Sequence, residues 1–205
     1  MKRNLTILLT FLFTAMVLVG CKNDEISENS NEFKPFAVGE KIKLKSVIGN
    51  EITVVRTENG FKMDGSKKII MFDFFATYCQ PCRDEAAHLM SFQLKNSDDF
   101  MIIGLITFED ITDKEVVDNF SKNYNAYYFI ANSKTNPNDR IIEQVLRDIS
   151  YQSALTIPFK VIYKNGIVQQ VSNNEMPSSN KREFYVGKLP VSLLQSDLDR
   201  IKSAK

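Results

Sequence analysis

One apolar segment that runs directly into a CxxC pair constrains this chain more than any other feature. Residues 69–76 are apolar or aromatic everywhere except at Asp73, and so continuous a run is typical of a strand covered on both faces. Pro81 follows, in what would be the first turn of a helix, where its missing N–H costs nothing. Apolar residues then recur at helical spacing: Ala86, Leu89, Met90 and Phe92. We therefore predict a buried strand, a turn with two cysteines, and a helix, as in a parallel α/β sheet.

The spacing of the cysteines predicts their chemistry. Cys79 and Cys82 are separated only by Gln80 and Pro81, which brings the two sulfurs close enough to form a reversible disulfide. Cys79 stands at the helix start, where unpaired N–H groups and the helix dipole stabilise an anion, so we predict that it is the nucleophilic thiolate. Cys82 lies one turn further along. We expect it to be shielded and to resolve the mixed disulfide that Cys79 forms.

Three other interpretations of the cysteine pair stay open. A structural zinc site needs two further ligands, for which the chain offers only Cys21 and His88, and we expect no metal site. A purely structural disulfide would close a very short loop and stabilise the fold little. Two inert, buried thiols are the third interpretation. The strand–CxxC–helix arrangement favours redox chemistry over all three.

The same stretch resembles the active site of the thioredoxin superfamily, and most of all its TlpA/ResA-type thiol–disulfide oxidoreductases. Residues 72–79, FDFFATYC, are similar to the family's V-[DN]-F-W-A-x-W-C run, and residues 82–85, CRDE, to its C-R-x-E. Phe75 and Tyr78 stand where the family usually has tryptophan, and Ala87 stands where it often has proline. These departures keep ring bulk around the disulfide but change the polarity of its rim.

The resemblance implies an α/β, thioredoxin-like fold with an N-terminal β-hairpin and a central helix–strand insertion. Weak strand signals over residues 36–61, with a turn near Gly49-Asn50, agree with the hairpin. An extra helix and strand over about residues 108–137 match the insertion. Residues 171–188 are typical of a long polar loop, and a final amphipathic helix is expected to open at Pro190.

A second motif of the family lies at Thr156-Ile157-Pro158. The family places a cis-proline here, facing the disulfide, and Pro158 matches it. A cis X-Pro bond needs a structural reason, because trans is normally favoured. The resemblance implies one: the cis bond frees the Ile157 backbone to pair with an extended substrate segment beside Cys79, as in strand addition. The alternative is a trans proline that caps an ordinary strand.

Asp73 and Glu85 are the predicted acid–base helpers. A buried carboxylate rarely stays ionised without a partner, so we expect a raised pKa for Asp73. In thioredoxins an aspartate at this position passes protons to and from the buried cysteine, although many TlpA-type members have asparagine there. Glu85 lies three residues after Cys82, on the same helical face, and the matching glutamate of ResA-type proteins tunes the cysteine pair. The alternative is that Glu85 is a solvated residue of the first turn that favours the dipole.

The N-terminus has the pattern of a targeting segment. Lys2 and Arg3 supply a positive start, residues 5–19 are an apolar stretch, and Leu18-Val19-Gly20-Cys21 resembles a bacterial lipobox. Cleavage before Cys21 would leave that thiol carrying several acyl chains, which anchor a protein firmly. An ordinary signal peptide or an uncleaved anchor helix is the alternative, although the apolar run is short for a membrane span. We therefore predict a lipoprotein on the extracytoplasmic side of the inner or outer membrane.

These signals divide the chain into three parts. The predicted boundaries are 1–20 for the signal peptide, 21–35 for a flexible polar tether and 36–205 for the thioredoxin-like domain. At 205 residues, with 43% hydrophobic and 25% charged residues, the chain can build its own core. A formal net charge of +1 suggests no nucleic-acid partner. We expect a monomer.

We predict a membrane-tethered enzyme that reduces protein disulfides, and the resemblance adds apo-cytochrome c as a substrate. No cofactor motif is present, so electrons must come from another protein, which in the family is a transmembrane dithiol relay. A disulfide-donating oxidase or isomerase is the first alternative, but strong oxidants of the superfamily often carry histidine where this chain has Gln80-Pro81. A thiol peroxidase is the next, but peroxiredoxins place threonine three residues before the reactive cysteine, whereas Thr77 lies two before Cys79. A non-catalytic binding module that uses the groove beside Pro158 is the last.

The same residues predict the direction of electron flow. An oxidising protein needs groups that stabilise the reduced Cys79 thiolate. Gln80 is neutral and Pro81 donates nothing, while Arg83 is the one nearby cation and is expected to point to solvent. The sequence therefore predicts a reductant.

Overall fold

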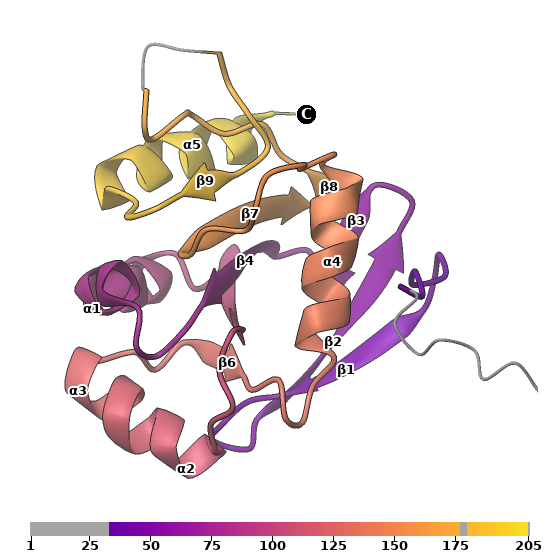
Figure 1. Ribbon diagram of the computed structural model, residues 1–205. Helices are drawn as coiled ribbons and strands as arrows, with labels where there is room; N and C mark the ends of the chain where they lie inside the picture. Colours follow the sequence, from indigo (N-terminus) through magenta and orange to yellow (C-terminus); the bar gives the residue numbers. More distant parts are fainter. Residues whose placement is uncertain (1–32, 177–179, 205) are drawn as a thin grey trace, which may run out of the picture. The chain divides into compact units, whose positions relative to one another are not determined.

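The central strand of a mixed sheet, β4, ends at Phe75 and leads through the turn with Cys79 into α1 (Figure 1). The strand order is β6-β5-β4-β7-β8, and β9 also pairs with β7. The strands of the parallel half are β4 (Ile69–Phe75), β5 (Phe100–Ile106) and β6 (Phe129–Ala131). The strands of the antiparallel half are β7 (Phe159–Lys164), β8 (Ile167–Val168) and β9 (Tyr185–Val186). This order and these directions are those of the thioredoxin-like α/β fold, which confirms the predicted fold class.

The computed structural model describes residues 33–176 and 180–204. The predicted signal peptide, Cys21 and most of the predicted tether lie outside the described residues. The compact unit begins at Phe33, ahead of the predicted start at Phe36. The Arg147 guanidinium lies 4.5 Å from the centre of the Phe33 ring, and Arg140 Nε donates to the Lys34 carbonyl at 2.8 Å. Residues 33–35 are thus held against a helix of the domain.

The two faces of the central sheet bury separate hydrophobic cores. On one face the sheet packs against α1 (Gln80–Lys95) and α5 (Val191–Ser203), and on the other against α4 (Asn138–Asp148) and the N-terminal strands (Figure 1). Every residue of β4 is buried. Its side chains alternate: Met71 and Phe75 belong to the core under α1, and Phe72 and Phe74 to the opposite core. Burial on both faces explains why the segment is continuously apolar.

The predicted N-terminal hairpin is confirmed and is extended by a third strand. The three strands of this antiparallel sheet are β1 (Lys41–Lys45), β2 (Glu51–Thr57) and β3 (Gly60–Met63). The turn between β1 and β2 contains Gly49-Asn50, as predicted. Gly60 allows the sheet to approach the domain closely, because a Cβ at that position would lie 2.3 Å from a ring carbon of Tyr163. The strand β3, which begins directly after the tight turn that follows Thr57, can therefore pack against β7.

The central insertion is confirmed in outline. The predicted extra helix consists of α2 (Asp113–Val116), the π-helical segment η1 (Val117–Ser121) and α3 (Lys122–Tyr124). The predicted extra strand follows as β6. No helix in residues 33–176 or 180–204 has the length and apolarity needed to cross a membrane.

The prediction of a polar loop over residues 171–188 is wrong in part. Val171 forms a bridge with Arg182 and is fully buried, and Tyr185 pairs with β7 as part of β9. The hydroxyl of Tyr185 donates to Asp197 Oδ2 at 2.7 Å, and the Ser172 N–H donates to the same oxygen at 2.7 Å. The Asp197 carboxylate on α5 thus accepts hydrogen bonds from this segment, although the two are far apart in the sequence. The polar sequence of the segment therefore does not keep the segment out of the core.

Candidate active site

A disulfide joins Cys79 and Cys82 where β4 passes into α1. The S–S distance is 2.13 Å and the two Cα atoms are 5.3 Å apart. Cys79 is the N-cap of α1, its Sγ accepts from the Cys82 N–H at 3.4 Å, and Pro81 falls in the first turn. Cys79 is 8% exposed and Cys82 is 3% exposed. The order of exposure is the predicted one, but in this oxidised form both sulfurs are largely covered.

Two side chains from other elements hold the turn before Cys79. The Thr77 N–H and Oγ1 donate to the two carboxylate oxygens of Glu109, at 2.6 and 2.7 Å. Arg83 Nε donates to the Thr77 carbonyl at 2.6 Å, and the guanidinium lies 5.4 Å from the centre of the Tyr124 ring. The expectation that Arg83 points to solvent is therefore wrong. Glu109 was not anticipated from the sequence, because the contact spans two loops.

An aromatic rim stands beside Cys79. Tyr78 is 56% exposed and Phe108 is 57% exposed. The Tyr78 hydroxyl lies 3.5 Å from the Phe108 carbonyl, which it can reach only as a weak donor. Phe108 has a φ of 62°, which is unusual for a bulky residue. Both rings thus face solvent next to the disulfide, where another polypeptide could contact them.

The peptide bond between Ile157 and Pro158 is cis, as the resemblance implied. Phe159, the next residue, pairs with Phe74, so Pro158 lies level with the end of β4 that leads into the CxxC turn. The Pro158 carbonyl accepts from the Gly187 N–H at 2.8 Å. Within the described residues, neither backbone polar group of Ile157 has a hydrogen-bond partner. No described residue occupies these groups, so they suit pairing with an incoming strand.

A buried triad of charged residues joins the strand that leads into the CxxC turn to β7 and α1: Asp73 on β4, Lys160 on β7 and Glu85 on α1. The Lys160 Nζ is 3.2 Å from Asp73 Oδ1 and 2.5 Å from Glu85 Oε1. The side chain of Lys160 is 0% exposed, and those of the two carboxylates are each 2% exposed. The interpretation of Glu85 as a solvated first-turn residue is therefore wrong. α1 presents Glu85 to the sheet, where the second oxygen accepts from the Leu189 N–H at 3.0 Å.

Burial shifts the ionisation of all three groups. It raises the pKa of Asp73, and the Lys160 ammonium offsets only part of that effect. Burial likewise raises the pKa of Glu85, against the pull of Lys160 and with the added repulsion of Asp73. For Lys160 burial alone would lower the pKa, but the two carboxylates together raise it above its usual value. The expected raised pKa of Asp73 is thus confirmed in direction.

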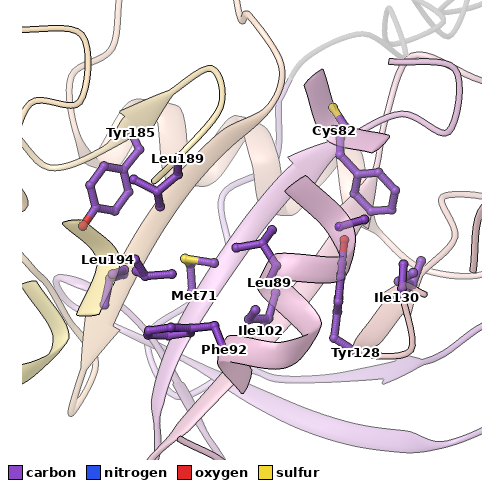
Figure 2. Close-up of a cluster of buried hydrophobic side chains, with 14 of the residues drawn as sticks. Met71, Cys82, Leu89, Phe92, Ile102, Tyr128, Ile130, Tyr185, Leu189 and Leu194 are labelled. Atoms are coloured by element: carbon purple, nitrogen blue, oxygen red, sulfur yellow. The ribbon is translucent and has the colours of Figure 1, made fainter. Parts of the chain in front are cut away.

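Sheet geometry explains how these groups meet. Asp73 is paired with Lys160 on one side and with Gly104 of β5 on the other, so the three residues lie in one row. A Cβ on Gly104 would lie 2.9 Å from a Phe75 ring carbon and 3.1 Å from one of Tyr128. The missing side chain makes room for the Tyr128 phenol, whose pKa burial and both carboxylates raise well above its usual value. Figure 2 shows the Tyr128 ring in the cluster that also contains Cys82.

Lys160 was not predicted from the sequence, although its position within an apolar run indicates a buried charge. Lys160 interrupts an apolar strand, between Phe159 and Val161. A lysine in a strand buried on both faces is stable only beside a carboxylate. Arg83 is therefore not the one cation near the cysteines. His88 is exposed, and no cluster in residues 33–176 and 180–204 could hold a metal ion.

Comparison with known proteins gives structural likeness only. No family model matches the sequence, and no curated protein matches it. StoA from Bacillus subtilis is 15% identical, with a TM-score of 0.49 over 80% of this chain and 99% of that chain. A thioredoxin-family thiol:disulfide interchange protein from Chlorobium tepidum is 21% identical, with a TM-score of 0.48 over 83% of this chain and 95% of that chain. A thiol-disulfide oxidoreductase from Bacteroides fragilis is 13% identical, with a TM-score of 0.48 over 80% and 99%.

Because these identities and TM-scores are low, the fold assignment rests on the strand order of this chain. The assignment of chemistry rests on the residues of its own site.

Proposed function

We propose that this protein is a thiol–disulfide oxidoreductase that reduces disulfides in exported proteins. The observation that carries the proposal is the Cys79–Cys82 disulfide at the start of α1, level with the cis-proline Pro158, with a buried acid–base cluster on β4, β7 and α1. The substrates include apo-cytochrome c by resemblance. The helix start supplies donors and a dipole for a thiolate at Cys79.

The reaction conserves electrons and sulfur bonds. In the reduced protein the Cys79 thiolate attacks one sulfur of a substrate disulfide, the substrate S–S bond breaks, and the other substrate sulfur leaves as a thiolate. The Cys82 thiolate then attacks Cys79 Sγ. The mixed disulfide breaks, the second substrate thiol is released, and the Cys79–Cys82 disulfide forms. The substrate gains two electrons, which the protein recovers from a second dithiol protein, in our proposal one embedded in the membrane.

The site has features that suit an extended polypeptide. The free backbone groups of Ile157 support pairing with a substrate strand. The exposed rings of Tyr78 and Phe108 provide apolar contact on the other side of Cys79. A substrate cysteine held between these two edges would lie beside the attacking sulfur.

Electrostatics favour a reductant. Moving from the potential of thioredoxin, about −270 mV, to that of DsbA, about −120 mV, requires roughly 7 kcal/mol of extra stabilisation of the reduced form. A helix terminus contributes only about 0.3–2 kcal/mol. The ammonium of Lys160 adds no net positive charge, because two carboxylates surround it. We expect a potential below about −220 mV in a glutathione titration, and a value above about −150 mV would favour a disulfide donor instead.

Trapping of mixed disulfides tests the division of labour. Cys82→Ser should accumulate Cys79-linked adducts with substrate proteins, because the resolving sulfur is gone. Cys79→Ser is the matched control and should trap few. Equal trapping by the two variants would contradict the assignment. Failure of the wild-type protein to reduce insulin disulfides would instead favour a non-catalytic binding module.

A further inference from the structure

The buried triad of Asp73, Lys160 and Glu85 has one positive charge for two carboxyl groups. No other cation in the described part of the chain lies within ion-pair distance of either carboxylate. Fully ionised, the triad would carry a net negative charge that is almost completely excluded from water, which costs several kcal/mol. The triad therefore retains one proton more readily than an exposed pair of carboxylates would.

The contacts of the two carboxyl groups are unequal. Glu85 is bound on both oxygens, by Lys160 Nζ at 2.5 Å and by the Leu189 N–H at 3.0 Å. Asp73 Oδ1 lies 3.2 Å from Lys160 Nζ but has no aligned hydrogen bond. A carboxylate that accepts from an ammonium and a backbone N–H is stabilised in its charged form. The negative charge thus belongs on Glu85, and the proton belongs on Asp73.

We propose that Lys160 is a positioning residue: it fixes the negative charge on Glu85, so that the proton exchange with Cys82, which the thioredoxin resemblance already assigns to Asp73, falls to that carboxyl group alone. The proposal rests on the proposed function and adds to it a residue from β7. It divides the work of the two carboxylates: Glu85 holds Lys160, and Asp73 carries the proton.

The burial of the surrounding groups supports such a transfer. Asp73 lies between Met71 and Phe75 on the face of β4 that packs against α1. Cys82 belongs to the same cluster as Met71, and Figure 2 shows both. The charged or titratable groups buried here are Asp73 from β4, Lys160 from β7, Glu85 and Cys82 from α1, and Tyr128 from the segment before β6. Tyr128 keeps its proton, because its pKa is raised well above the usual value.

The proton moves with the sulfur chemistry. When the Cys79–Cys82 disulfide is reduced, Cys82 leaves as a thiolate and takes the proton from the Asp73 carboxylic acid. When Cys82 later attacks Cys79 Sγ to release a substrate, it returns that proton to the Asp73 carboxylate. Each transfer moves the proton between two groups of the same buried cluster and leaves the total charge of that cluster unchanged. In the reduced protein the negative charge of the departing Cys82 sulfur thus rests on the triad and not on the sulfur.

Three substitutions give different shifts of one pH–rate profile. The measured quantity is the rate at which Cys82 closes the disulfide after reduced protein reacts with glutathione disulfide, followed by quenched mass spectrometry. The acid limb of this profile is the range in which the rate falls as the pH is lowered. Lys160→Met should shift this limb to higher pH by about one unit or more, because both carboxyls lose their counter-charge. That shift corresponds to roughly a tenfold change in rate at fixed pH. Glu85→Gln should shift the limb to lower pH, because Lys160 then neutralises Asp73 alone. Asp73→Asn should remove the limb.

Two controls separate charge from structure. Lys43→Met removes an exposed lysine of β1 and should leave the profile unchanged. Lys160→Arg keeps the positive charge and should restore most of the profile lost in Lys160→Met. Shifts of the same sign in Lys160→Met and Glu85→Gln would overturn the proposal, because a purely structural disturbance of the site moves both in one direction.

A second measurement needs neither catalysis nor a folded Lys160 variant. The oxidised wild-type protein at mildly acidic pH should show the infrared carbonyl band of one buried carboxylic acid. This band should disappear in Asp73→Asn, and in Glu85→Gln it should appear only at lower pH than in the wild type, because Lys160 then neutralises Asp73 alone. A band that persists in Asp73→Asn would place the proton on Glu85 and overturn the proposal. Since this readout needs no substrate, it stands even where the proposed reductase activity fails.

Discussion

At the scale of single residues, Phe108 has the backbone conformation least suited to its side chain. Its φ of 62° is in the left-handed region, which costs a residue with a Cβ roughly 1–2 kcal/mol. Glu109, the next residue, holds this loop against Thr77 with two hydrogen bonds. The hydrogen bonds of Glu109 therefore hold the loop in place, while the Phe108 ring faces solvent beside the disulfide.

We predict that Phe108→Gly is more stable than Phe108→Ala by about 1 kcal/mol, because glycine adopts this φ without the Cβ penalty. Both variants remove the same exposed ring, so the comparison isolates the backbone. Urea unfolding of the two oxidised proteins measures the difference. An alanine variant as stable as the glycine variant would show that the loop relaxes to another conformation.

At the scale of elements, a buried ion pair joins the N-terminal sheet to α4. Arg56 of β2 binds Asp148 at the end of α4 through two guanidinium nitrogens, with Nη2 donating to Oδ1 at 2.8 Å. The side chains are 8% and 13% exposed. Gln144 Nε2 also donates to Asp148 Oδ1 at 2.9 Å, while Arg56 Nη1 donates to the Gly60 carbonyl at 3.2 Å. Both charges thus have several partners and little water.

We predict that Asp148→Ala lowers the free energy of unfolding by about 3 kcal/mol, because it leaves the Arg56 charge buried without its partner. The double variant Arg56→Met/Asp148→Leu should lose markedly less, since no charge remains. Equilibrium unfolding in urea gives both values. A double variant that is less stable than Asp148→Ala would contradict the desolvation argument.

At the scale of the whole molecule, the triad makes stability depend on pH. A carboxyl whose pKa is raised in the folded state contributes stability that is complete below its unfolded value and is lost as pH rises through the folded value. For Asp73 the loss therefore begins above its ordinary 3.8, and for Glu85 above 4.5. The oxidised protein should thus lose a stabilising contribution between acidic and neutral pH.

We predict that Asp73→Asn gains stability relative to the wild type as pH rises, because the amide cannot ionise in the core. Thermal unfolding across that pH range measures the change. Asp118→Asn is a control with no slope in that range: Lys114 and Lys122 lower the pKa of the half-buried Asp118 from 3.8 to about 2, so its contribution to stability changes only below its ordinary value and the difference from wild type should be flat above it. A flat difference between Asp73→Asn and wild type would refute the raised pKa.

The predicted lipobox at the N-terminus also concerns the whole molecule, because a lipid anchor would determine where the domain acts. We predict that Cys21→Ser releases the protein from membranes or blocks its processing, because the motif Leu18-Val19-Gly20-Cys21 would lose the thiol that carries the lipid. Membrane fractionation and the mass of the mature protein measure the effect. Unchanged partition and unchanged mass would rule out lipidation. Cys79→Ser, which removes a thiol inside the domain, is the control.

Much of the fold could be predicted because it is encoded locally. The apolar run of β4, the proline in the first turn of α1 and the stripe of Leu194, Leu198 and Ile201 on α5 each follow from a periodicity or a cap within a few residues. The disulfide between Cys79 and Cys82 follows from their spacing. The cis bond before Pro158 followed from a resemblance in sequence and not from periodicity.

The tertiary structure alone decided which groups surround the disulfide. Lys160 is 75 residues from Glu85 along the chain, and Leu189 is 104 residues from it, yet both bind its carboxylate. The Thr77–Glu109 bonds span 32 residues. The sequence determined that a carboxyl group at Asp73 would be buried, since its strand is apolar throughout. Only the pairing of β4 with β7 could decide that a lysine lies opposite, because strand pairing is set by long-range packing and not by local periodicity.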